Sequence, residues 1–493
     1  MSSENDTLSP AASGYDDALP QAAPLDDLTV QMNHLVLSPQ EQHHDEVLSS
    51  PLLTVPLIDR SPPPQFGLFG AAVLEGSSCA AEARLYHNVT CPSSVFICGS
   101  QGSGKSNTLA CLLENCLIPS QLGKLPHPLT GIVFHYDSFV SDSGGSPCEA
   151  AFIASHKNVS VRVLCAPTNV RTIQNIYSDI PNVNIEPLTL SDEDLNTRRM
   201  NDLMAVGDSG SKPLYMQVVN RILRDMRLEQ QTTGLGFSYK KFRECLASED
   251  LTPGQLSPLN QRLDTLESFM VERKGFADET IDWEPKAGQL TVVDLSCPCV
   301  TAELACSLFD ICLSLFVEKK ASIGRVVALD EAHKYMKESE ESQTLTNSLL
   351  ETIRLQRHLG VRVLISTQEP TVSTKLLDLC SMTIVHRFTS PDWLRTLKTH
   401  LAGISSMSVT VADEEDKIQA VNPVTIGGRD PIMEMLSIII SLHTGQALVF
   451  SPSVVLGRQE RDGPAVLQRL GHRALRVKIR SRLTRDGGRT VMA

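Results

Sequence analysis

Several features are missing from this chain of 493 residues, and each absence excludes a class of protein. The thirteen cysteines include no Cys-x-x-Cys pair, which argues against a zinc site and against a disulfide framework. Cys98, Cys306 and Cys312 lie within apolar runs, as buried reduced thiols do. No basic-then-apolar leader opens the chain, and its longest apolar stretch, around Leu436 to Leu442, is too short to span a bilayer. We therefore expect a soluble intracellular protein, cytoplasmic or nuclear, without membrane insertion.

Basic charge is also scarce. The chain has 44 Lys and Arg against 57 Asp and Glu, a net charge of −13. The charge is unevenly distributed, because residues 1–60 carry ten acidic residues against Arg60 alone, whereas nine basic residues from Arg461 onward face only Asp462 and Asp486. Overall charge therefore argues against a protein that coats DNA uniformly, and a nucleic-acid partner has to meet a local basic surface.

The two ends of the chain are predicted to be tails. Residues 1–64 are rich in Ser, Pro, Asp and Ala with little periodicity, which predicts a disordered acidic tail. Its apolar run Leu52–Ile58 is a piece of linker or, alternatively, a docking strand. Residues 461–493 are predicted to form a basic tail that either holds phosphates or serves as a solvated or subunit-bridging end. Its basic cluster consists of Arg473, Arg476, Lys478, Arg480, Arg482 and Arg485.

A predicted strand, a glycine-rich loop and a predicted helix follow one another around residue 99. The apolar run Val95–Cys98 indicates the strand, and Asn107–Cys116 is patterned as a helix. Glycines permit positive φ and close backbone approach, so that consecutive N–H groups can converge on phosphates at the helix N-terminus. Lys105 would reach the β- and γ-phosphates, and the Ser106 hydroxyl would ligate Mg²⁺. The predicted nucleotide-binding residues are Gly99, Ser100, Gln101, Gly102, Ser103, Gly104, Lys105, Ser106 and Asn107.

A second motif, Val326–Glu331, is an apolar strand that ends in two carboxylates. A buried strand delivers Asp330 to its carboxyl end, where it can hold Mg²⁺ through water. Glu331 is placed to accept a proton from the attacking water as general base. Such a pair alone is more often a solvated strand end, but together with the loop it indicates a Walker B motif beside the Walker A loop.

The fold class predicted from the strand series is α/β, with a doubly wound, mostly parallel sheet. Residues 65–190 and 287–460 are expected to form the two parts of its core. Between them, residues 191–286 are expected to be a helical insertion, which Ser191 and Asp194 open with a capping-box pattern. The expected strands are residues 131–135, 161–164, 290–294, 325–329, 361–365, 382–385 and 447–450.

The motifs together resemble the HerA/FtsK-like pumping ATPases, specifically the HerA branch with its relatives in conjugative DNA transfer. Beyond the loop and Val326–Glu331, the matching stretches are Val292–Ser296, Arg354–Pro370 and Gly445–Pro452. The resemblance covers roughly residues 90–455 and implies a RecA-like core.

The same resemblance implies roles for three further residues. Gln368, in Thr367-Gln368-Glu369-Pro370, would sense the γ-phosphate, and Arg354 or Arg357 would serve as an arginine finger across a ring interface. The alternatives are a plain strand end for Gln368 and, for the arginines, charges that complement a helix dipole.

These motifs predict Mg²⁺-dependent hydrolysis of ATP by a P-loop ATPase. The expected assembly is a homo-oligomeric ring, with a hexamer among the options, that moves DNA. The alternative is a nucleotide-gated scaffold that binds an unidentified protein partner through its helical insertion and tails. The presence of both Glu331 and Gln368 favours the motor.

Overall fold

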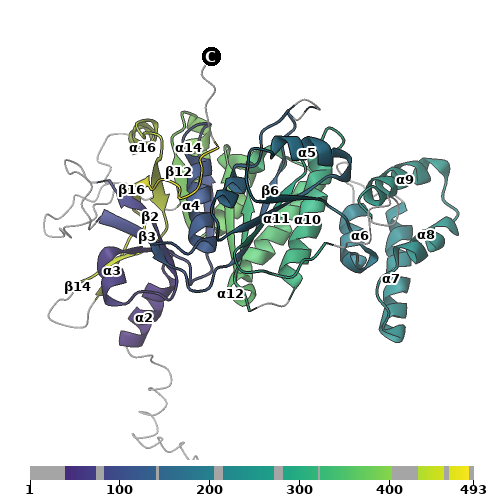
Figure 1. The fold of residues 1–493 in the computed structure, drawn as a ribbon, viewed down its shortest axis with the longest axis horizontal. Coiled ribbons are helices and arrows are strands. Elements are labelled where there is room, and N and C mark those ends of the chain that lie inside the picture. Colours follow the sequence, from purple (N-terminus) through teal and green to yellow (C-terminus); the bar gives the residue numbers. More distant parts are fainter. Residues whose placement is uncertain are drawn as a thin grey trace, which may run out of the picture. The chain divides into compact units, whose positions relative to one another are not determined.

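The computed structural model describes residues 39–73, 83–139, 141, 144–204, 215–270, 281–319, 322–401, 431–459 and 466–487. The chain forms two units, Met1–Glu46 and Val47–Ala493. The described part of the first unit, residues 39–46, is the beginning of helix α2 (Pro39–Ser49). Within its described residues, the second unit contains one 16-stranded sheet with helices around it (Figure 1).

Eight neighbouring strands of the described sheet run parallel, in the order β12-β4-β11-β10-β6-β9-β7-β8. In β4, Val95 and Ile97 join the core on one face, whereas Phe96 and Cys98 join the core on the other. Burial on both faces explains why these strands lack apolar-polar alternation, and the predicted mostly parallel α/β sheet is confirmed. The strands are β4 (Ser94–Cys98), β6 (Thr130–His135), β7 (Ser160–Cys165), β8 (Val183–Pro187), β9 (Gln289–Asp294), β10 (Arg325–Leu329), β11 (Val361–Thr367) and β12 (Met382–His386).

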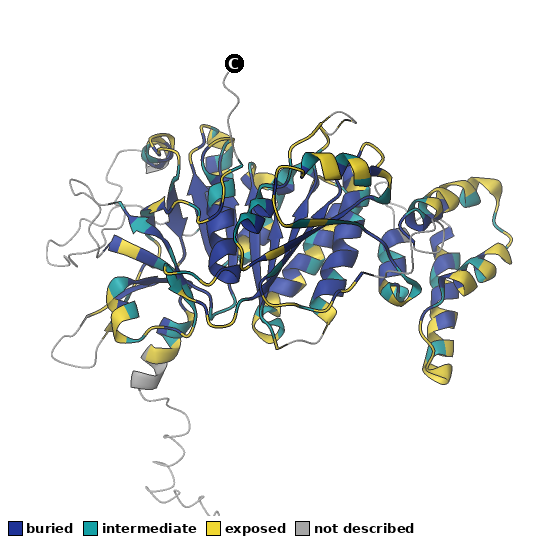
Figure 2. Cartoon of the chain, viewed as in Figure 1, coloured by how far each residue is buried: buried dark blue, intermediate teal, exposed yellow. Residues whose placement is uncertain are grey.

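Helices cover both faces of the parallel strands, and their inward sides are buried (Figure 2). Helix α4 (Lys105–Leu117), the 3-10 helix η2 (Glu149–Ser155) and α5 (Val170–Ile176) pack into the same core as Val95 and Ile97. Helices α10 (Ala302–Glu318) and α11 (Glu340–Arg354) pack into the opposite core. Other helices are α12 (Gln356–Leu359), α13 (Thr374–Leu379), α14 (Pro391–His400) and α16 (Pro431–Ile440).

Both ends of the chain add strands to a second, largely antiparallel half of the sheet, which corrects two predictions. Its order is β15-β14-β1-β3-β2-β16-β13, and β5 pairs with β2. Among the described strands of this half, β1 and β14 pair in parallel and the other pairs are antiparallel. The strands are β1 (Leu52–Thr54), β2 (Phe66–Ala72), β3 (Arg84–Asn88), β5 (Gly123–Lys124), β13 (Gln446–Phe450), β14 (Val455–Gln459), β15 (Val466–Arg469) and β16 (Ala474–Ile479).

The prediction of a disordered tail over residues 1–64 is wrong for residues 39–64, which form α2, β1, α3 and their connections, whereas residues 1–38 lie outside the described residues. Leu52 and Leu53 of β1 are buried, and α3 (Val55–Arg60) follows directly. The hydroxyl of Thr54 donates to the carbonyl of Leu456 at 2.9 Å. Six of the ten acidic residues in the first sixty precede Pro39, so much of the composition that predicted disorder belongs to the earlier residues.

The prediction of a basic tail is wrong for residues 466–487. Strand β16 lies between β13 and β2, with Leu475, Val477 and Ile479 buried. The alternation of these apolar residues with basic ones is the strand pattern that places one side chain inward and the next outward.

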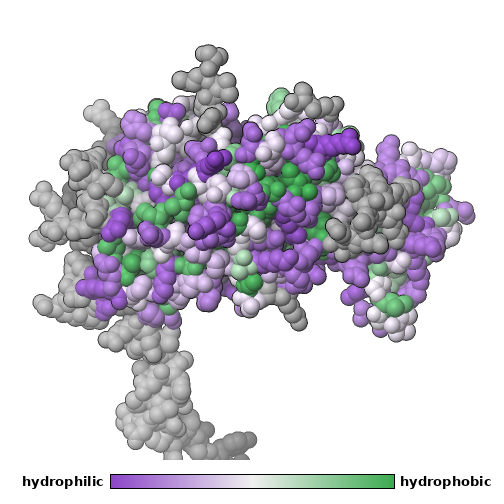
Figure 3. Space-filling model, in the orientation of Figure 1, coloured by the Kyte–Doolittle hydropathy of each residue, from purple (hydrophilic) through white to green (hydrophobic). Residues whose placement is uncertain are grey.

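The expected helical insertion contains α6 (Thr197–Met204), α7 (Tyr215–Thr233), α8 (Tyr239–Ala247) and α9 (Pro253–Glu267). The capping box is present, since Asp194 Oδ2 accepts from the Ser191 backbone N–H at 2.9 Å. On the face drawn in Figure 3 the surface of α7–α9 is mostly hydrophilic. No helix in the described part of the chain is both long and apolar enough to span a membrane.

Candidate active site

The loop between β4 and α4 lies at the carboxyl edge of the parallel strands. Gly99, Gly102 and Gly104 have φ values of 152°, 71° and 111°. A Cβ on Gly99 would lie 2.6 Å from Cβ of His386, and a Cβ on Gly104 would lie 3.0 Å from the backbone nitrogen of Gly445. Both the backbone angles and the available space therefore require glycine at these two positions.

The ends of neighbouring strands hold this loop in place. The backbone N–H and the hydroxyl of Ser100 donate to the carbonyl of Arg387, directly after β12, at 2.9 and 2.8 Å. His386 Nδ1 lies 2.9 Å from the carbonyl of Gln446, and its Nε2 lies 2.9 Å from the hydroxyl of Thr108. Burial lowers the pKa of His386 to about 4, so the ring is neutral, donating through Nδ1 and accepting through Nε2. Sequence reasoning missed this histidine, since a single His at a strand end has no motif.

Lys105 lies inside the loop. Only 4% of the residue is exposed, and its Nζ donates to the carbonyl of Ser100 at 3.1 Å. Burial lowers the pKa of Lys105, while the nearby carboxylates of Glu331 and Asp330 act in the opposite direction. The acceptor in this contact is an uncharged carbonyl, so an anionic group in the loop would outcompete it by pairing two opposite charges.

The remaining residues of the predicted nucleotide loop are placed as follows. Gln101 is exposed at the tip, and Ser106 is half-buried in the first turn of α4. Asn107 donates through Nδ2 to the carbonyl of Arg480 at 3.1 Å, so this side chain is engaged with the C-terminal part of the chain.

Asp330 follows β10 at the same sheet edge. Its Oδ2 lies 3.2 Å from His135 Nδ1, at the end of β6, and 3.7 Å from Cys148 Sγ; all three residues are buried. Burial by itself would raise the pKa of Asp330, but the hydrogen bond and the charge of His135 outweigh it and hold this pKa below its usual range. The side chain is therefore a carboxylate.

The donors here fit the Mg²⁺ ion that the motifs predicted. Among the described residues, Oδ1 of Asp330 has no protein partner, because His135 and Cys148 contact Oδ2. A carboxylate oxygen and the hydroxyl of Ser106 are hard oxygen ligands, which Mg²⁺ prefers. Neither His135 nor Cys148 carried a signal in the sequence that linked it to Asp330.

Glu331 and Gln368 are brought together. Glu331 adopts a left-handed backbone with φ 48°, uncommon for a residue other than glycine. Its Oε2 accepts from Gln368 Nε2 at 3.2 Å and lies 3.3 Å from His333 Nδ1. The backbone N–H of Gln368 points at the same His333 nitrogen, at 3.4 Å. Because β10 and β11 are parallel neighbours, the ends that carry these residues meet at one edge.

His333 connects the two predicted catalytic residues. Burial lowers the pKa of His333, so the ring is neutral near pH 7 and its Nδ1 can accept from the Gln368 backbone. As the pH falls through this lowered pKa, Nδ1 gains a proton that faces the Glu331 carboxylate. The resulting ion pair would stabilise the carboxylate and weaken it as a base.

We therefore expect His333→Ala to lower kcat, by up to about 100-fold, the size of effect that misplacing a reacting group produces. Affinity for a non-hydrolysable ATP analogue should change little. The parent should also lose turnover on the acidic side as His333 takes up its proton, and the variant should lack this component. Profiles of kcat against pH that superimpose after scaling would exclude His333 from this role.

Arg354 and Arg357 lie far from the nucleotide loop of their own chain. Arg354 ends α11 and Arg357 lies in α12, both exposed, just before the start of β11. The seven residues of β11 separate them from Gln368 by roughly 23 Å at about 3.3 Å per residue. Neither arginine can therefore reach a nucleotide bound to the same chain, which leaves a role across a subunit interface or at the helix terminus.

No protein-family model matches the chain, and no curated protein sequence matches it. Among solved structures, VirB4 of Thermoanaerobacter pseudethanolicus superposes with a TM-score of 0.51 at 11% identity, over 85% of this chain and 97% of that chain. The bacterial conjugative coupling protein TrwBΔN70 gives a TM-score of 0.43 at 13% identity, over 83% and 95% of the two chains. B204, the DNA-packaging ATPase from Sulfolobus turreted icosahedral virus, gives 0.30 at 12% identity, over 73% and 93%.

At these identities the likeness to VirB4 concerns the fold alone, and the two lower scores carry no further argument. The match extends over nearly the whole VirB4 structure. The chain therefore has the fold of VirB4, in agreement with the α/β fold that its strand series predicted.

Proposed function

We propose that the chain hydrolyses ATP with Mg²⁺ at the carboxyl edge of its parallel strands. The observation that carries the proposal is the contact between Glu331 and Gln368. Both residues stand where two neighbouring strands end, beside the strand β4 that leads into the loop of Lys105. A loop that only binds nucleotide does not require a carboxylate held by a sensor residue.

Each residue has a distinct task in this proposal. Lys105 exchanges the Ser100 carbonyl for phosphate oxygens and neutralises their charge. Asp330 and Ser106 hold the Mg²⁺ ion, which would polarise the phosphate. Glu331 accepts the proton of the attacking water, and Gln368 keeps its carboxylate aligned and responds to the terminal phosphate.

We further propose that the chain works as a ring-forming translocase of nucleic acid. The fold shared with VirB4 supports this extension. So do the positions of Arg354 and Arg357, which are exposed and remote from their own loop and are thus available to a neighbouring subunit.

Arg354→Ala or Arg357→Ala is expected to reduce turnover more than nucleotide affinity. A finger stabilises charge that develops in the transition state, and its loss can cost about 10³-fold or more. Mixing that variant with Glu331→Gln should restore part of the activity, because some interfaces then pair an intact base with an intact finger. Arg395→Ala, an exposed arginine on α14, is the control that should leave turnover unchanged. Absence of rescue, in subunits shown to exchange, would count against a shared site.

The basic C-terminal residues give this proposal less support than their sequence indicated. The side chains of Arg480 and Arg482 are only 5% and 2% exposed and pair with Glu114 and Glu149. Removing residues 471–493 would also take β16 out of the sheet, so that truncation cannot report on DNA binding alone.

Steady-state ATP turnover, measured with and without duplex and single-stranded DNA, tests the proposed function. A translocase should hydrolyse ATP faster when its DNA is present. Hydrolysis that is indifferent to both DNA forms, together with no DNA binding at low salt, would favour the nucleotide-gated scaffold.

A further inference from the structure

The residues after β16 run back across helix α4, and we infer that this segment, residues 480–487, sets the affinity of the loop for nucleotide. We call it the C-terminal strap. Arg480 of the strap and Glu114 of α4 are the positioning residues, acting through the orientation of α4. The inference rests on the proposed nucleotide site and extends it to a segment that belongs to none of the nucleotide-binding motifs.

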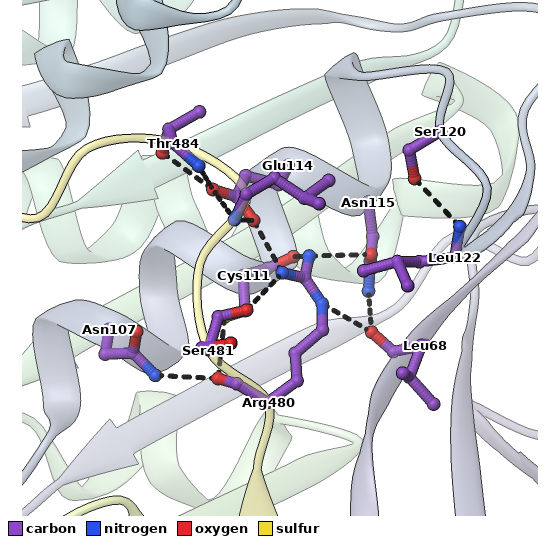
Figure 4. Close-up of polar contacts among 11 residues, drawn as sticks. Leu68, Asn107, Cys111, Glu114, Asn115, Ser120, Leu122, Arg480, Ser481 and Thr484 are labelled. Atoms are coloured by element: carbon purple, nitrogen blue, oxygen red, sulfur yellow. Dashed lines mark hydrogen bonds and ion pairs between the residues drawn. The ribbon is translucent and has the colours of Figure 1, made fainter.

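The guanidinium of Arg480 joins three elements, and all five of its N–H groups have acceptors (Figure 4). The acceptors are Leu68 O at 2.8 Å for Nε, Glu114 Oε2 at 2.6 Å and Ser481 O at 2.9 Å for Nη1, and Cys111 O and Asn115 Oδ1, both at 3.1 Å, for Nη2. Strand β2, helix α4 and the strap thus meet at one side chain. A lysine could not replace it, because an ammonium has three donors and no planar fork.

Glu114 is fully buried in the last turn of α4. Its Oε1 accepts from the backbone N–H groups of Leu483 and Thr484, each at 3.0 Å, and from the hydroxyl of Thr484 at 2.7 Å. Its Oε2 accepts from Arg480. A buried ion pair of this kind specifies one arrangement of the strap on the helix, since removing either partner leaves the other charge buried and unpaired.

Two contacts connect the strap to helix α4, and one of them lies in the first turn, beside the nucleotide loop. The carbonyl of Arg480 accepts from Asn107 Nδ2 at 3.1 Å and lies 3.4 Å from Cys111 Sγ. Asn107 lies two residues after Lys105, in the first turn of α4. Because the helix moves as a rigid element, a displaced strap would change how its amino end, with Lys105, faces the phosphates.

The strap also reaches the acidic side of the site. The side chain of Arg482 is buried, its Nη1 lies 3.4 Å from Glu149 Oε2, and its Nη2 donates to the Glu149 carbonyl at 3.1 Å. Glu149 directly follows Cys148, which contacts Asp330. Burial raises the pKa of Glu149, and the negative charge of Asp330 raises it further. The positive charge of Arg482 lowers it. Docking of the strap thus places a cation beside Glu149.

The test is a calorimetric titration of the full chain with a non-hydrolysable ATP analogue and Mg²⁺, for the parent, Arg480→Ala and Arg480→Lys. Lys478→Ala is the matched control, because Lys478 is exposed two residues earlier. We expect Arg480→Ala to raise Kd by about 5–150-fold, the usual size of coupling between two sites. Arg480→Lys keeps the charge but loses the planar fork of donors, so its Kd should lie between those of the parent and Arg480→Ala. Lys478→Ala should bind like the parent.

Stoichiometry separates positioning from mere instability, since unfolded protein lowers the number of sites without changing the Kd of the folded fraction. Parent-like Kd values in both Arg480 variants would overturn the inference, and Arg480→Lys decides it if Arg480→Ala fails to fold. A parent that binds no nucleotide would instead refute the proposed function, and the inference with it.

Linkage adds a second, independent readout. If the docked strap strengthens nucleotide binding, bound nucleotide must stabilise the docked strap by the same free energy. Hydrogen exchange at the amides of Leu483 and Thr484, which donate to Glu114, should therefore slow when the analogue saturates the site. Exchange at these amides that is unaffected by the analogue would contradict the coupling.

Discussion

Lys105→Ala is expected to abolish measurable nucleotide binding while leaving the fold intact. The ammonium is the cation of the loop, and among the described residues its own hydrogen bond is only to the Ser100 carbonyl. Each hydrogen bond to a charged group contributes about 1.5–3 kcal/mol, so losing two such bonds to phosphates raises Kd by roughly 100-fold or more. Calorimetric titration with ATP and Mg²⁺ measures this directly.

The matched control for Lys105→Ala is Lys124→Ala, which removes an exposed lysine from β5. That variant should bind ATP with the parent's affinity. Unchanged ATP affinity in Lys105→Ala would show that the nucleotide, if one binds, does not use this loop.

Glu331→Gln is expected to bind ATP but to lose most turnover. The substituted side chain has the shape of the original and can remain near Gln368, but it cannot accept the proton of the attacking water. A general base contributes about 10²–10⁴-fold, and turnover should fall by that factor. Single-turnover hydrolysis with saturating ATP separates this loss from any change in binding.

Glu369→Gln supplies the comparison for that experiment. Glu369 is an exposed carboxylate immediately after Gln368, and it lacks the contact that Glu331 makes with the Gln368 amide. Its replacement should leave hydrolysis near the parent rate. A Glu331→Gln variant that also hydrolyses ATP near the parent rate would remove Glu331 from the role of base.

The sequence predicts those parts of the site whose residues lie close together in one segment of the chain. The loop from Gly99 to Ser106 needs glycines, a lysine and a hydroxyl in a fixed order along one segment. Asp330 and Glu331 follow an apolar strand directly, and the end of such a strand in a parallel sheet is where ligands bind. The mostly parallel sheet follows from the same apolar runs.

The parts that escaped prediction depend on residues distant in the chain. Arg480 and Glu114 are 366 positions apart, and neither shows in its own neighbourhood that it is buried and paired. His135 ends β6, and Asp330 directly follows the neighbouring strand β10. The two residues are 195 positions apart in the chain. A lone arginine, glutamate or histidine is compatible with many environments, so only the folded arrangement assigns it one.

At both ends of the sequence, composition averaged over a long segment led to the wrong prediction of a tail. Strand β1 has only three residues, Leu52–Thr54, and is stable because β3 and β14 pair with it. The apolar run Leu52–Ile58 allows a docking strand or a piece of linker, and only the pairing in the folded chain decides for a strand, over Leu52–Thr54. At the other end, Val477 and Ile479 alternate with basic residues as on a strand or edge ribbon, and the pairing of β16 with β13 and β2 places that strand inside the sheet.

Release of inorganic phosphate from ATP by the purified full chain, with Mg²⁺ or with a chelator, tests the central claim most directly. We expect phosphate release that requires Mg²⁺. Both Lys105→Ala and Glu331→Gln should lose this release, the first because it fails to bind ATP and the second because it fails to cleave it. ATP that binds and stays intact in the parent, or phosphate release that neither substitution reduces, would contradict it.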